Sequence, residues 1–457
     1  MKRMIRLLMT ILCLGITAGH GIAEDSPEQL VRTAAEAPLE KQNAKETPDQ
    51  RWQNFLAEHG WDAGLAAGGV IYIPERELII SSASAFTKVR VGQPGWLESR
   101  IVAFENAEMD AKTKIIRYLA ESVETKRSLA LLEKAQWNDG EVDKVRNLNE
   151  IEESLKRIGK KSVALAEKSL DKALQKLDPD YDPAKYEGKS VEDLKVIAED
   201  LFNRQIKTVA MGTLIGVTPL YSTEGAAGEG EYQVLMGVIW SPKLNRLAMS
   251  LFNDEYNIPK VKPGKKLSEY IPADPLALLS TIGTRIVIDE NGEYAVLAYA
   301  QAQPRRTGPG RRQAALHQAK QIAANRARAQ LVNFIREGLT LRDSEASKEL
   351  SREFSDMTFG TETIRDYRKM ITGKRVKVKL SGLRILKEWS LAHPATGQQV
   401  AGAVVAWSPG SARLSKQAGE MMQRANDRKA SQAVQGTKAQ QGQGPALQSM
   451  KIDTSAY

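Results

Sequence analysis

The chain has 457 residues, of which 42% are hydrophobic and 26% are charged, and its formal net charge at neutral pH is +9. These values are those of a soluble globular protein with room for about two to four domains, and not those of a disordered chain. A charge this modest for the length permits contact with anionic surfaces but gives no reason to expect a nucleic-acid partner.

Residues 1–23 have the layout of a secretory signal peptide. Lys2, Arg3 and Arg6 give a positive start, an apolar run follows, and a stretch of small residues ends at Ala23. The apolar run is shorter than the ~20 residues that span a bilayer, so an uncleaved membrane anchor is the less favoured alternative. We therefore expect an exported protein.

The single cysteine, Cys13, lies inside this apolar run. A lipid-attachment site needs a small residue just before the cysteine, and Leu12 stands there, so we expect no lipid anchor. Cleavage after Ala23 leaves a mature chain with no disulfide and no thiol chemistry. No later segment is apolar enough to cross a bilayer, so we expect no transmembrane segment in the mature chain.

Residues 24–66 precede the first regular domain. The acidic, Ala-rich part at 24–50 shows little apolar periodicity and is predicted to be mobile. A short amphipathic helix is predicted at 50–66, and its apolar side carries Trp52, Phe55, Leu56 and Trp61.

Two parts of the chain repeat one pattern. Residues 69–86 and 285–302 each read as a strand, a polar turn and a second strand, and a Pro-Gly turn follows each. A helix comes next in both copies, with small or apolar residues at every fourth position, which places them along one stripe. The stripes are Ala103, Ala107, Ala111, Ile115 and Leu119 in the first copy and Ala319, Ala323, Ala327, Leu331 and Ile335 in the second.

Each copy then closes with two strands that end in Trp-Ser-Pro. Gly216 corresponds to Gly382 and Trp240 to Trp407. We therefore predict an α+β fold of two duplicated β-β-α-β-β domains, at 67–256 and 276–410, in which the helix packs on a small, mainly antiparallel sheet. Chance similarity between two unrelated α+β domains is the alternative.

The first copy carries a helical insertion at about 124–205. Apolar residues near a 3,4 spacing predict one long amphipathic helix at 147–177, and a second arm through 115–135 would complete a coiled-coil-like hairpin with its turn near 137–141. The hairpin packs within the chain in one interpretation and forms a homo-oligomer contact in the other.

A turn rich in aspartate follows the insertion's long helix. Asp178, Asp180 and Asp182 alternate as in calcium loops, but Pro183 and Lys189 stand where such a loop needs Gly and Glu. A rigid turn is therefore expected, with a helix that starts after Ser190.

Two segments lie outside the repeats. Residues 257–275 are rich in proline and lysine and read as a linker packed on the surface. Residues 411–457 are rich in Gln, Ala, Lys and Gly and are predicted to be a disordered tail.

The mature chain shows no pattern typical of catalysis. Its histidines, His59, His317 and His393, lack an Asp, Cys or second His at ligand spacing and are expected on the surface. Nucleophile, phosphate-loop, dinucleotide and zinc motifs are missing. Acid pairs such as Glu75 and Glu77 could act as general acid and base, but such pairs are common in a chain with 56 acidic residues and alone do not indicate catalysis. We therefore expect no catalytic residue, metal or cofactor, and no enzyme.

Basic residues gather in two places. Arg305, Arg306, Arg311 and Arg312 surround a turn before a helix, where backbone N–H groups favour anions. Alternate positions of a predicted strand hold Lys374, Arg375, Lys377 and Lys379. Together they predict a docking patch for an anionic partner. The alternative is a solvated loop and a strand edge that charge keeps from pairing.

The second helix, "AKQIAANRARAQLVNFI" at 319–335, carries a family resemblance with its flanking strands. Ala319, Ala323, Ala327, Leu331, Phe334 and Ile335 supply the pattern, and the first copy matches it less fully. This arrangement resembles the twenty-kilodalton outer-membrane lipoprotein family and the amino-terminal domain of flagellar assembly protein T. The resemblance covers roughly half of the chain and implies a bacterial, exported protein of a mostly non-enzymatic family. Because some members build rings or layers around envelope machines, it also implies a structural role.

These observations favour a structural or assembly component of a periplasmic or outer-membrane-associated machine of flagellar, secretion or conjugation type. Its partners would be envelope proteins or anionic envelope material. One alternative is a periplasmic ligand-binding module that uses the cleft between the repeats. The other is a hydrolase of cell-wall or surface polymers.

Overall fold

The computed structural model describes residues 26–439, apart from 41, 68, 122–124, 137–138, 159–162, 179–180, 187, 229–230, 252–257, 306–307, 343–359 and 374–380. The predicted signal peptide and the end of the predicted tail lie outside these residues. Within the described part, no helix combines the length and apolar character that crossing a membrane requires.

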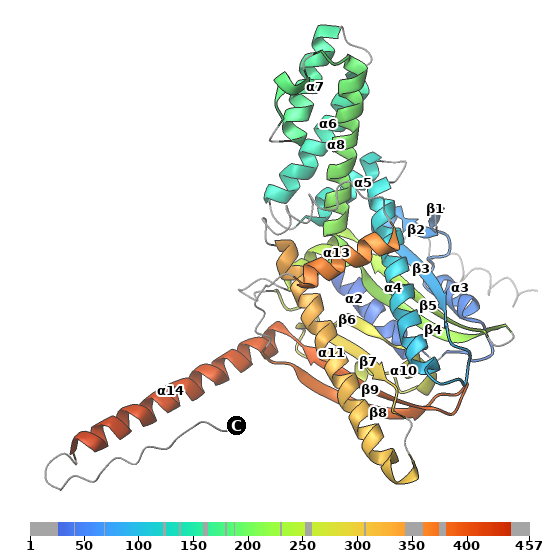
Figure 1. Ribbon diagram of the computed structural model, residues 1–457, viewed down its shortest axis with the longest axis vertical. Coiled ribbons are helices and arrows are strands. Elements are labelled where there is room, and N and C mark those ends of the chain that lie inside the picture. The colour runs from blue at the N-terminus through green and yellow to red at the C-terminus, as the bar shows by residue number, and fades with distance from the viewer. Residues whose placement is uncertain are drawn as a thin grey trace, which may run out of the picture.

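Both repeats form the predicted unit (Figure 1). In the first, β2 (Val70–Ile73) and β3 (Leu78–Phe86) are followed by α4 (Trp96–Glu121), β4 (Thr218–Gly228) and β5 (Glu231–Trp240). In the second, the elements are β6 (Gly283–Ile288), β7 (Tyr294–Ala302), α11 (Arg312–Arg342), β8 (Arg384–Ala392) and β9 (Gln399–Trp407).

The two sheets are antiparallel and share one strand order. It is β2-β3-β5-β4 in the first unit and β6-β7-β9-β8 in the second, and the first sheet gains β1 (Leu65–Ala67) beyond β2. The edge strand bulges at the same place in both, near Pro219 in β4 and near Ile385 in β8. The α+β fold with two β-β-α-β-β units is confirmed.

The small-residue stripes lie where the sequence predicted them. All ten stripe residues of α4 and α11 are buried. Ala319 and Ala323 pack against Ala401 and Ala403 of β9, and Ala103 and Ala107 pack against β5 in the same way. Because an alanine side chain is short, each helix lies close on its own sheet before larger residues fill the space.

The strands align one residue away from the predicted correspondence. The sequence comparison equated Ile79 with Ala295, but Trp240 pairs with Ile79, whereas Trp407 pairs with Val296. The connection between the second strand and the helix therefore differs by one residue between the copies, and only the helix keeps the original offset.

The repeated Trp-Ser-Pro is a strand end joined to a helix start. Ser241 caps α9 (Pro242–Ser250) by accepting a hydrogen bond from the Leu244 N–H, and proline occupies the first turn. Ser408 likewise accepts from the Ser411 N–H at the start of α14 (Pro409–Ala439). A serine hydroxyl satisfies a free helical N–H, and proline fits the first turn because it has none to satisfy.

Removing one of these caps should have a measurable cost. We expect Ser241→Ala to lower the free energy of unfolding in urea by about 1 kcal/mol, because the Leu244 N–H loses its acceptor inside the protein. Ser241→Asp keeps an acceptor and serves as the control. An alanine variant as stable as the parent would show that the serine does not act as a cap.

Helices of the insertion form a bundle that projects from the sheets (Figure 1). They are α5 (Thr125–Ala135), α6 (Asp139–Ile158), α7 (Val163–Leu177) and α8 (Val191–Gly212). The single helix predicted at 147–177 is wrong, because α6 and α7 are separate and pack side by side with α8. Folding back lets both apolar stripes be buried, which one straight helix would leave in water.

The helix α8 starts after Ser190, as predicted. Ser190 and Asp193 form a capping box at this start, and the short helix η3 (Pro183–Tyr186) precedes it. In the described residues no group of three or more His, Cys, Asp or Glu side chains is arranged to hold a metal ion.

Two flanking segments differ from their predictions. Residues predicted to be mobile form α2 (Pro27–Glu36) and η1 (Ala37–Leu39), because Leu30, Val31 and Ala34 make a narrow apolar face that packs against β6 and β4. The amphipathic helix is α3 (Pro48–Glu58). The predicted disordered tail is helical as far as Ala439, in α14.

The remaining elements lie in the connections between the longer helices and strands. They are η2 (Pro74–Arg76), η4 (Leu214–Gly216), η5 (Leu267–Tyr270), α10 (Pro275–Ser280), η6 (Pro309–Arg311) and α13 (Thr361–Gly373). Leu267 and Tyr270 of the predicted linker are buried, so this linker is packed on the body as expected.

Candidate functional site

The junction between the two units is built around one buried ion pair. Arg100 on α4 donates hydrogen bonds from Nε and Nη2 to the carboxylate of Glu224 on β4, and both side chains are fully buried. The same guanidinium donates to Gln301 on β7 at 2.8 Å and to the carbonyl of Leu279 at the end of α10. One side chain of the first unit therefore binds two elements beyond it.

His393 completes this cluster from the second unit. Its Nε2 lies 3.6 Å from Glu224 Oε1 and 3.4 Å from the Tyr232 hydroxyl, and its Nδ1 accepts from the Ala395 N–H. The ring packs edge to face with Trp96 at 4.8 Å. The predicted surface position of His393 is wrong, because the β8–β9 loop folds against the start of α4 and buries the ring completely.

The charges of this cluster compensate one another. Burial alone would raise the pKa of Glu224, but the Arg100 charge and the hydrogen bonds from His393 and Arg100 outweigh it and lower the pKa to about 2. Glu224 is therefore a carboxylate at neutral pH. The buried, paired carboxylate of Glu224 therefore holds the units together and is not accessible to a substrate.

A second buried arginine joins the units at the strand edge. Arg285 on β6 donates to the carbonyls of Pro219 and Leu220 on β4, at 3.0 and 2.9 Å, and to the Ser222 hydroxyl at 3.1 Å. Burial lowers its pKa to about 10. It stays charged at neutral pH and bridges the first sheet to the second.

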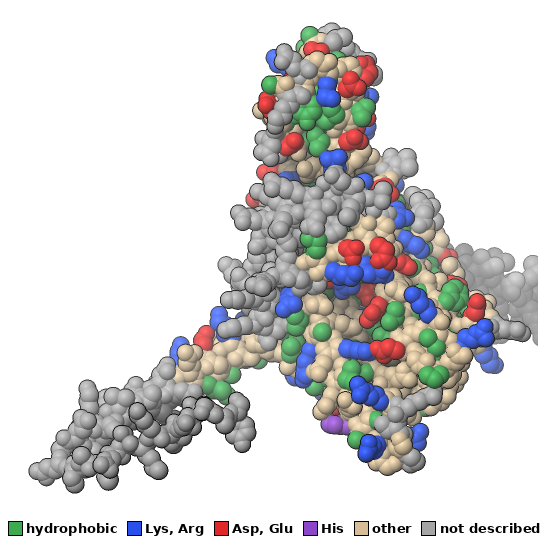
Figure 2. Space-filling view, in the orientation of Figure 1, with side chains coloured by type: hydrophobic (Ala, Val, Ile, Leu, Met, Phe, Trp, Pro, Cys, Tyr) green, Lys and Arg blue, Asp and Glu red, His purple; other side chains and the backbone are tan. Residues whose placement is uncertain are grey.

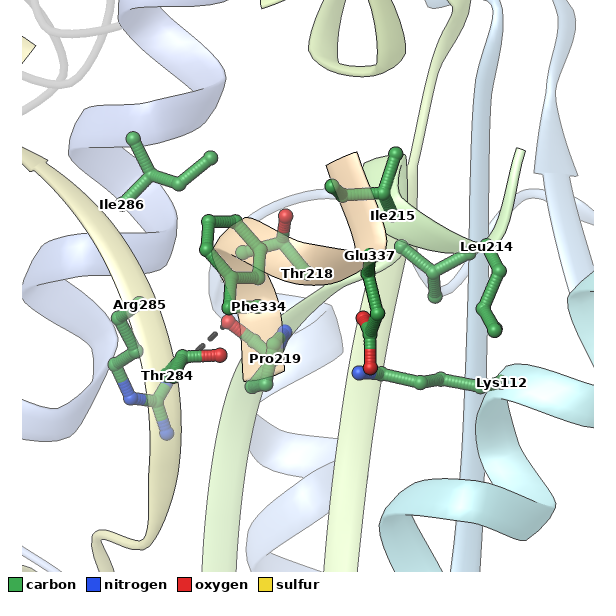
Figure 3. A pocket seen from close by; sticks show the side chains of 11 residues that line it. Lys112, Leu214, Ile215, Thr218, Pro219, Thr284, Arg285, Ile286, Phe334 and Glu337 are labelled. Atoms are coloured by element: carbon green, nitrogen blue, oxygen red, sulfur yellow. Dashed lines mark hydrogen bonds between the residues drawn. The ribbon is translucent and has the colours of Figure 1, made fainter. Parts of the chain in front are cut away.

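A small cavity lies beside this contact (Figure 3). Lys112 and Glu337 point toward each other on one side of it, and Thr284, Arg285 and Phe334 lie on the other. Its volume is about 10 Å³, which is room for about one water molecule. The junction therefore has no space here for the organic ligand that a cleft-binding module would hold.

Acids around the cavity are also paired. Lys112 lies 2.6 Å from Glu108, and Glu337 accepts a hydrogen bond from Arg368 of α13. Burial would raise the pKa of Glu108, but the Lys112 and Arg368 charges lower it. These groups serve as ion-pair partners rather than as proton donors.

The predicted basic patch is brought together only in part. Arg305, Arg311 and Arg312 are exposed around η6 and the first residue of α11, at the lower end of the body, where Figure 2 shows several basic side chains. Arg306 lies outside the described residues. So do Lys374, Arg375, Lys377 and Lys379, which leaves the strand half of the predicted patch without a structure.

Sequence reasoning missed the residues of the junction. Arg100, Glu224 and Arg285 are charged residues within otherwise apolar helix and strand patterns, and that was the available signal. It could not be used, because a charged side chain on a predicted core face gives no hint of which distant residue neutralises it.

Apolar side chains are exposed on two projecting elements. On α14 these are Leu414, Met421 and Met422, with exposed fractions of 68%, 65% and 69%. The insertion bundle exposes Leu165 on α7 and Val196 on α8. Figure 1 shows α14 leaving the body as a separate arm.

An open groove of about 660 Å³ lies at the base of α14. Leu267, Leu383 and Leu414 supply its apolar part. Glu293 crosses it to Lys260 at 3.0 Å and to Arg413 at 3.6 Å. The groove thus offers apolar contact with charged groups around it, which is typical of a protein-docking surface.

The fold and the junction define a two-unit α+β protein with a helical insertion and a projecting carboxyl-terminal helix. Residues 155–253 match a family described as Domain of unknown function (DUF6844), a span that includes α7, α8, β4, β5 and α9. Comparison with curated proteins gives no match.

A solved structure has a similar fold. It is the crystal structure of a hypothetical protein from Francisella tularensis, with 19% sequence identity and a TM-score of 0.52, and the match covers 81% of this chain and 92% of that one. At this identity the likeness supports the fold alone.

Proposed function

We propose that this protein is a non-enzymatic, exported bacterial component of a cell-envelope assembly, in which a rigid two-unit body presents α14 and the groove at its base to another envelope protein. The buried Arg100–Glu224 and Arg285 contacts support the rigid body. The predicted signal peptide and the resemblance to envelope domains support the location.

One comparison between the repeats carries the proposal. Leu247 of α9 and Leu414 of α14 hold the same place after Trp-Ser-Pro, each following an arginine. Leu247 is 7% exposed, because α9 packs against α5 and α2, whereas Leu414 is 68% exposed. The second copy therefore has the apolar helix, but no described residue covers it as α5 and α2 cover α9 in the first copy.

The chemistry of α14 indicates what the partner supplies. Leu414, Met421 and Met422 lie seven and eight residues apart, so they share one face of the helix. A single helix that stands away from the body has little stability of its own in water. Packing against an apolar surface of a partner would stabilise it. We expect a helix of the partner to pack on this face, as α5 packs on α9.

Cross-linking in intact cells tests this proposal. We expect the variant with Leu414, Met421 and Met422 changed to glutamate to lose its cross-linked products, because three charges would replace the apolar contact. Changing Lys416 and Gln423 to glutamate on the other faces of α14 is the matched control and should leave the products intact. The variant with Arg305, Arg311 and Arg312 changed to serine tests the basic patch in the same assay.

The outcomes separate the surfaces. Loss only in the apolar variant supports docking through α14, and loss only in the arginine variant would move the contact to the basic patch. Products that persist in every variant, at unchanged amounts in the envelope fraction, would contradict both.

A further inference from the structure

The outer edge of β4 is closed by side chains from elsewhere in the chain. Its carbonyls at Leu220, Ser222 and Glu224 face away from β5, and each accepts a hydrogen bond. The donors are Arg285 at 2.9 Å, Gln42 at 2.8 Å and Arg51 at 2.9 Å, in that order. Every second residue of this edge is thus satisfied, as a neighbouring strand would do.

The repeat identifies the same edge in the second unit. Ser222 pairs with Met236 in the first sheet, and Glu388 pairs with Ala403 in the second, three residues beyond the start of the same bulge. Leu386, Glu388 and Ser390 of β8 are therefore the counterparts of the three closed positions of β4. By this correspondence, their carbonyls face away from β9, as the three carbonyls of β4 face away from β5.

This second edge is open. The first seven residues of β4 are buried, whereas Trp389 alone is buried among the nine of β8. No donor reaches the carbonyls of Leu386, Glu388 or Ser390 from the described part of the chain. The first edge is closed by the α2–α3 segment and by β6, and no described residue takes their place along β8.

We propose that the outer edge of β8 is a docking site for an extended segment of a partner protein, which adds to the second sheet as a strand antiparallel to β8. Backbone groups of the segment would meet Leu386, Glu388 and Ser390 at alternate positions, as in other cases of strand addition. The proposal concerns a surface separate from α14 and does not depend on the envelope location.

Charge favours a different protein over a second copy of this chain. If two copies of β8 paired side by side about a two-fold axis, odd-numbered residues would lie opposite odd-numbered ones and even-numbered residues opposite even-numbered ones. Centred on the exposed middle of the strand, they would set Lys387 against Lys387 or Glu388 against Glu388 and be destabilised. A partner strand with an acidic residue opposite Lys387 and a basic one opposite Glu388 fits instead.

The competing explanation is that charge merely protects an unused edge. Lysine and short length are common ways to prevent edge pairing. However, β8 is nine residues long, keeps Trp389 and Leu391 against the second core, and pairs with β9 without interruption from Lys387 to Ala392, beyond its bulge.

A proline at an outward position tests the site. The Ser222 carbonyl of β4 faces outward, and N–H and C=O of one residue in an antiparallel strand point the same way, so we infer that the Glu388 N–H faces away from β9. Glu388→Pro would then remove a docking donor while keeping the β8–β9 ladder. Glu388→Ala keeps the donor and is the matched control. The probe is a nine-residue peptide of alternating Val and Thr with a central Lys-Glu pair, written from the amino end, which in antiparallel pairing sets Lys against Glu388 and Glu against Lys387.

We expect the peptide to bind the full chain and Glu388→Ala alike, at least tenfold more weakly to Glu388→Pro, and to slow amide hydrogen exchange at Leu386, Glu388 and Ser390. Melting temperatures of both variants check that they are folded. Equal binding to all three proteins, or no binding to any, would overturn the proposal. So would slow exchange at these amides before any peptide is added, because the chain itself would then close the edge.

Discussion

Replacing Arg100 with methionine should lower the free energy of unfolding by about 3–5 kcal/mol, because the Glu224 carboxylate would stay buried without a counter-charge. The same change removes the hydrogen bonds to Gln301 and to the Leu279 carbonyl, which join the units. Urea unfolding at neutral pH measures the effect.

A double variant separates the ion pair from the space that it fills. Arg100→Met with Glu224→Leu removes both charges and should regain most of the lost stability, since an apolar pair of similar size has no desolvation cost. Wild-type stability in the single Arg100→Met variant would mean that the junction does not depend on this pair.

The pH dependence of the same variants has a definite sign. The pKa of Glu224 is lowered to about 2 in the folded protein, so its contribution is complete at neutral pH and is lost as the pH falls from the ordinary carboxylate range toward 2. In Arg100→Met, burial instead raises this pKa, so mild acidification should narrow the difference from the parent. Urea unfolding of the parent and of Arg100→Met at a series of pH values measures how this difference in unfolding free energy changes.

Replacing Gly216 or Gly382 with any residue that has a side chain should lower the stability of the protein. A Cβ on Gly216 would lie 2.4–2.8 Å from Asn245 atoms, and one on Gly382 would lie 2.4–2.7 Å from the backbone of Ser411 and Ala412. Gly382 also has a φ of +83°, which favours glycine. We expect alanine at either site to destabilise by about 1–3 kcal/mol, with the larger effect at Gly382.

The matched control is Gly308→Ala, where a Cβ would meet nothing within 4 Å. Thermal unfolding of the three variants should rank Gly382→Ala lowest and Gly308→Ala level with the parent. A stable Gly382→Ala variant would show that α14 does not approach the second sheet as closely as α9 approaches the first.

These two glycines also explain why the duplication was predictable. Each lies where the chain enters the third strand of its unit and touches the helix that follows Trp-Ser-Pro, so one close contact requires the same residue twice. The alanine stripes, the strand ends and the serine caps are likewise local requirements. Patterns a few residues apart in the sequence record such requirements directly.

What the sequence did not predict depends on residues far apart. His393 was predicted to be exposed because its neighbours, Trp96, Tyr232 and Glu224, come from the other unit. The segment of α2 looked mobile because its narrow apolar face has meaning only against β6. Tertiary contacts of this kind leave little local trace.

The open edge of β8 shows what the repeat adds to sequence analysis. Charged residues along 384–392 would be read as ordinary surface positions from the sequence alone. Only the comparison with β4, where Arg285, Gln42 and Arg51 donate to the corresponding carbonyls, shows that no side chain of the described residues closes this edge. The first unit thus shows which contacts at the strand edge the described residues of the second unit do not make.

Differential scanning calorimetry of the full chain tests most directly whether the two repeats form one body through their buried junction. The account predicts one cooperative transition in which the calorimetric and van't Hoff enthalpies agree, because Arg100, Glu224 and His393 lose their partners together. Two separate transitions in the unaltered protein, each with its own enthalpy, would contradict it.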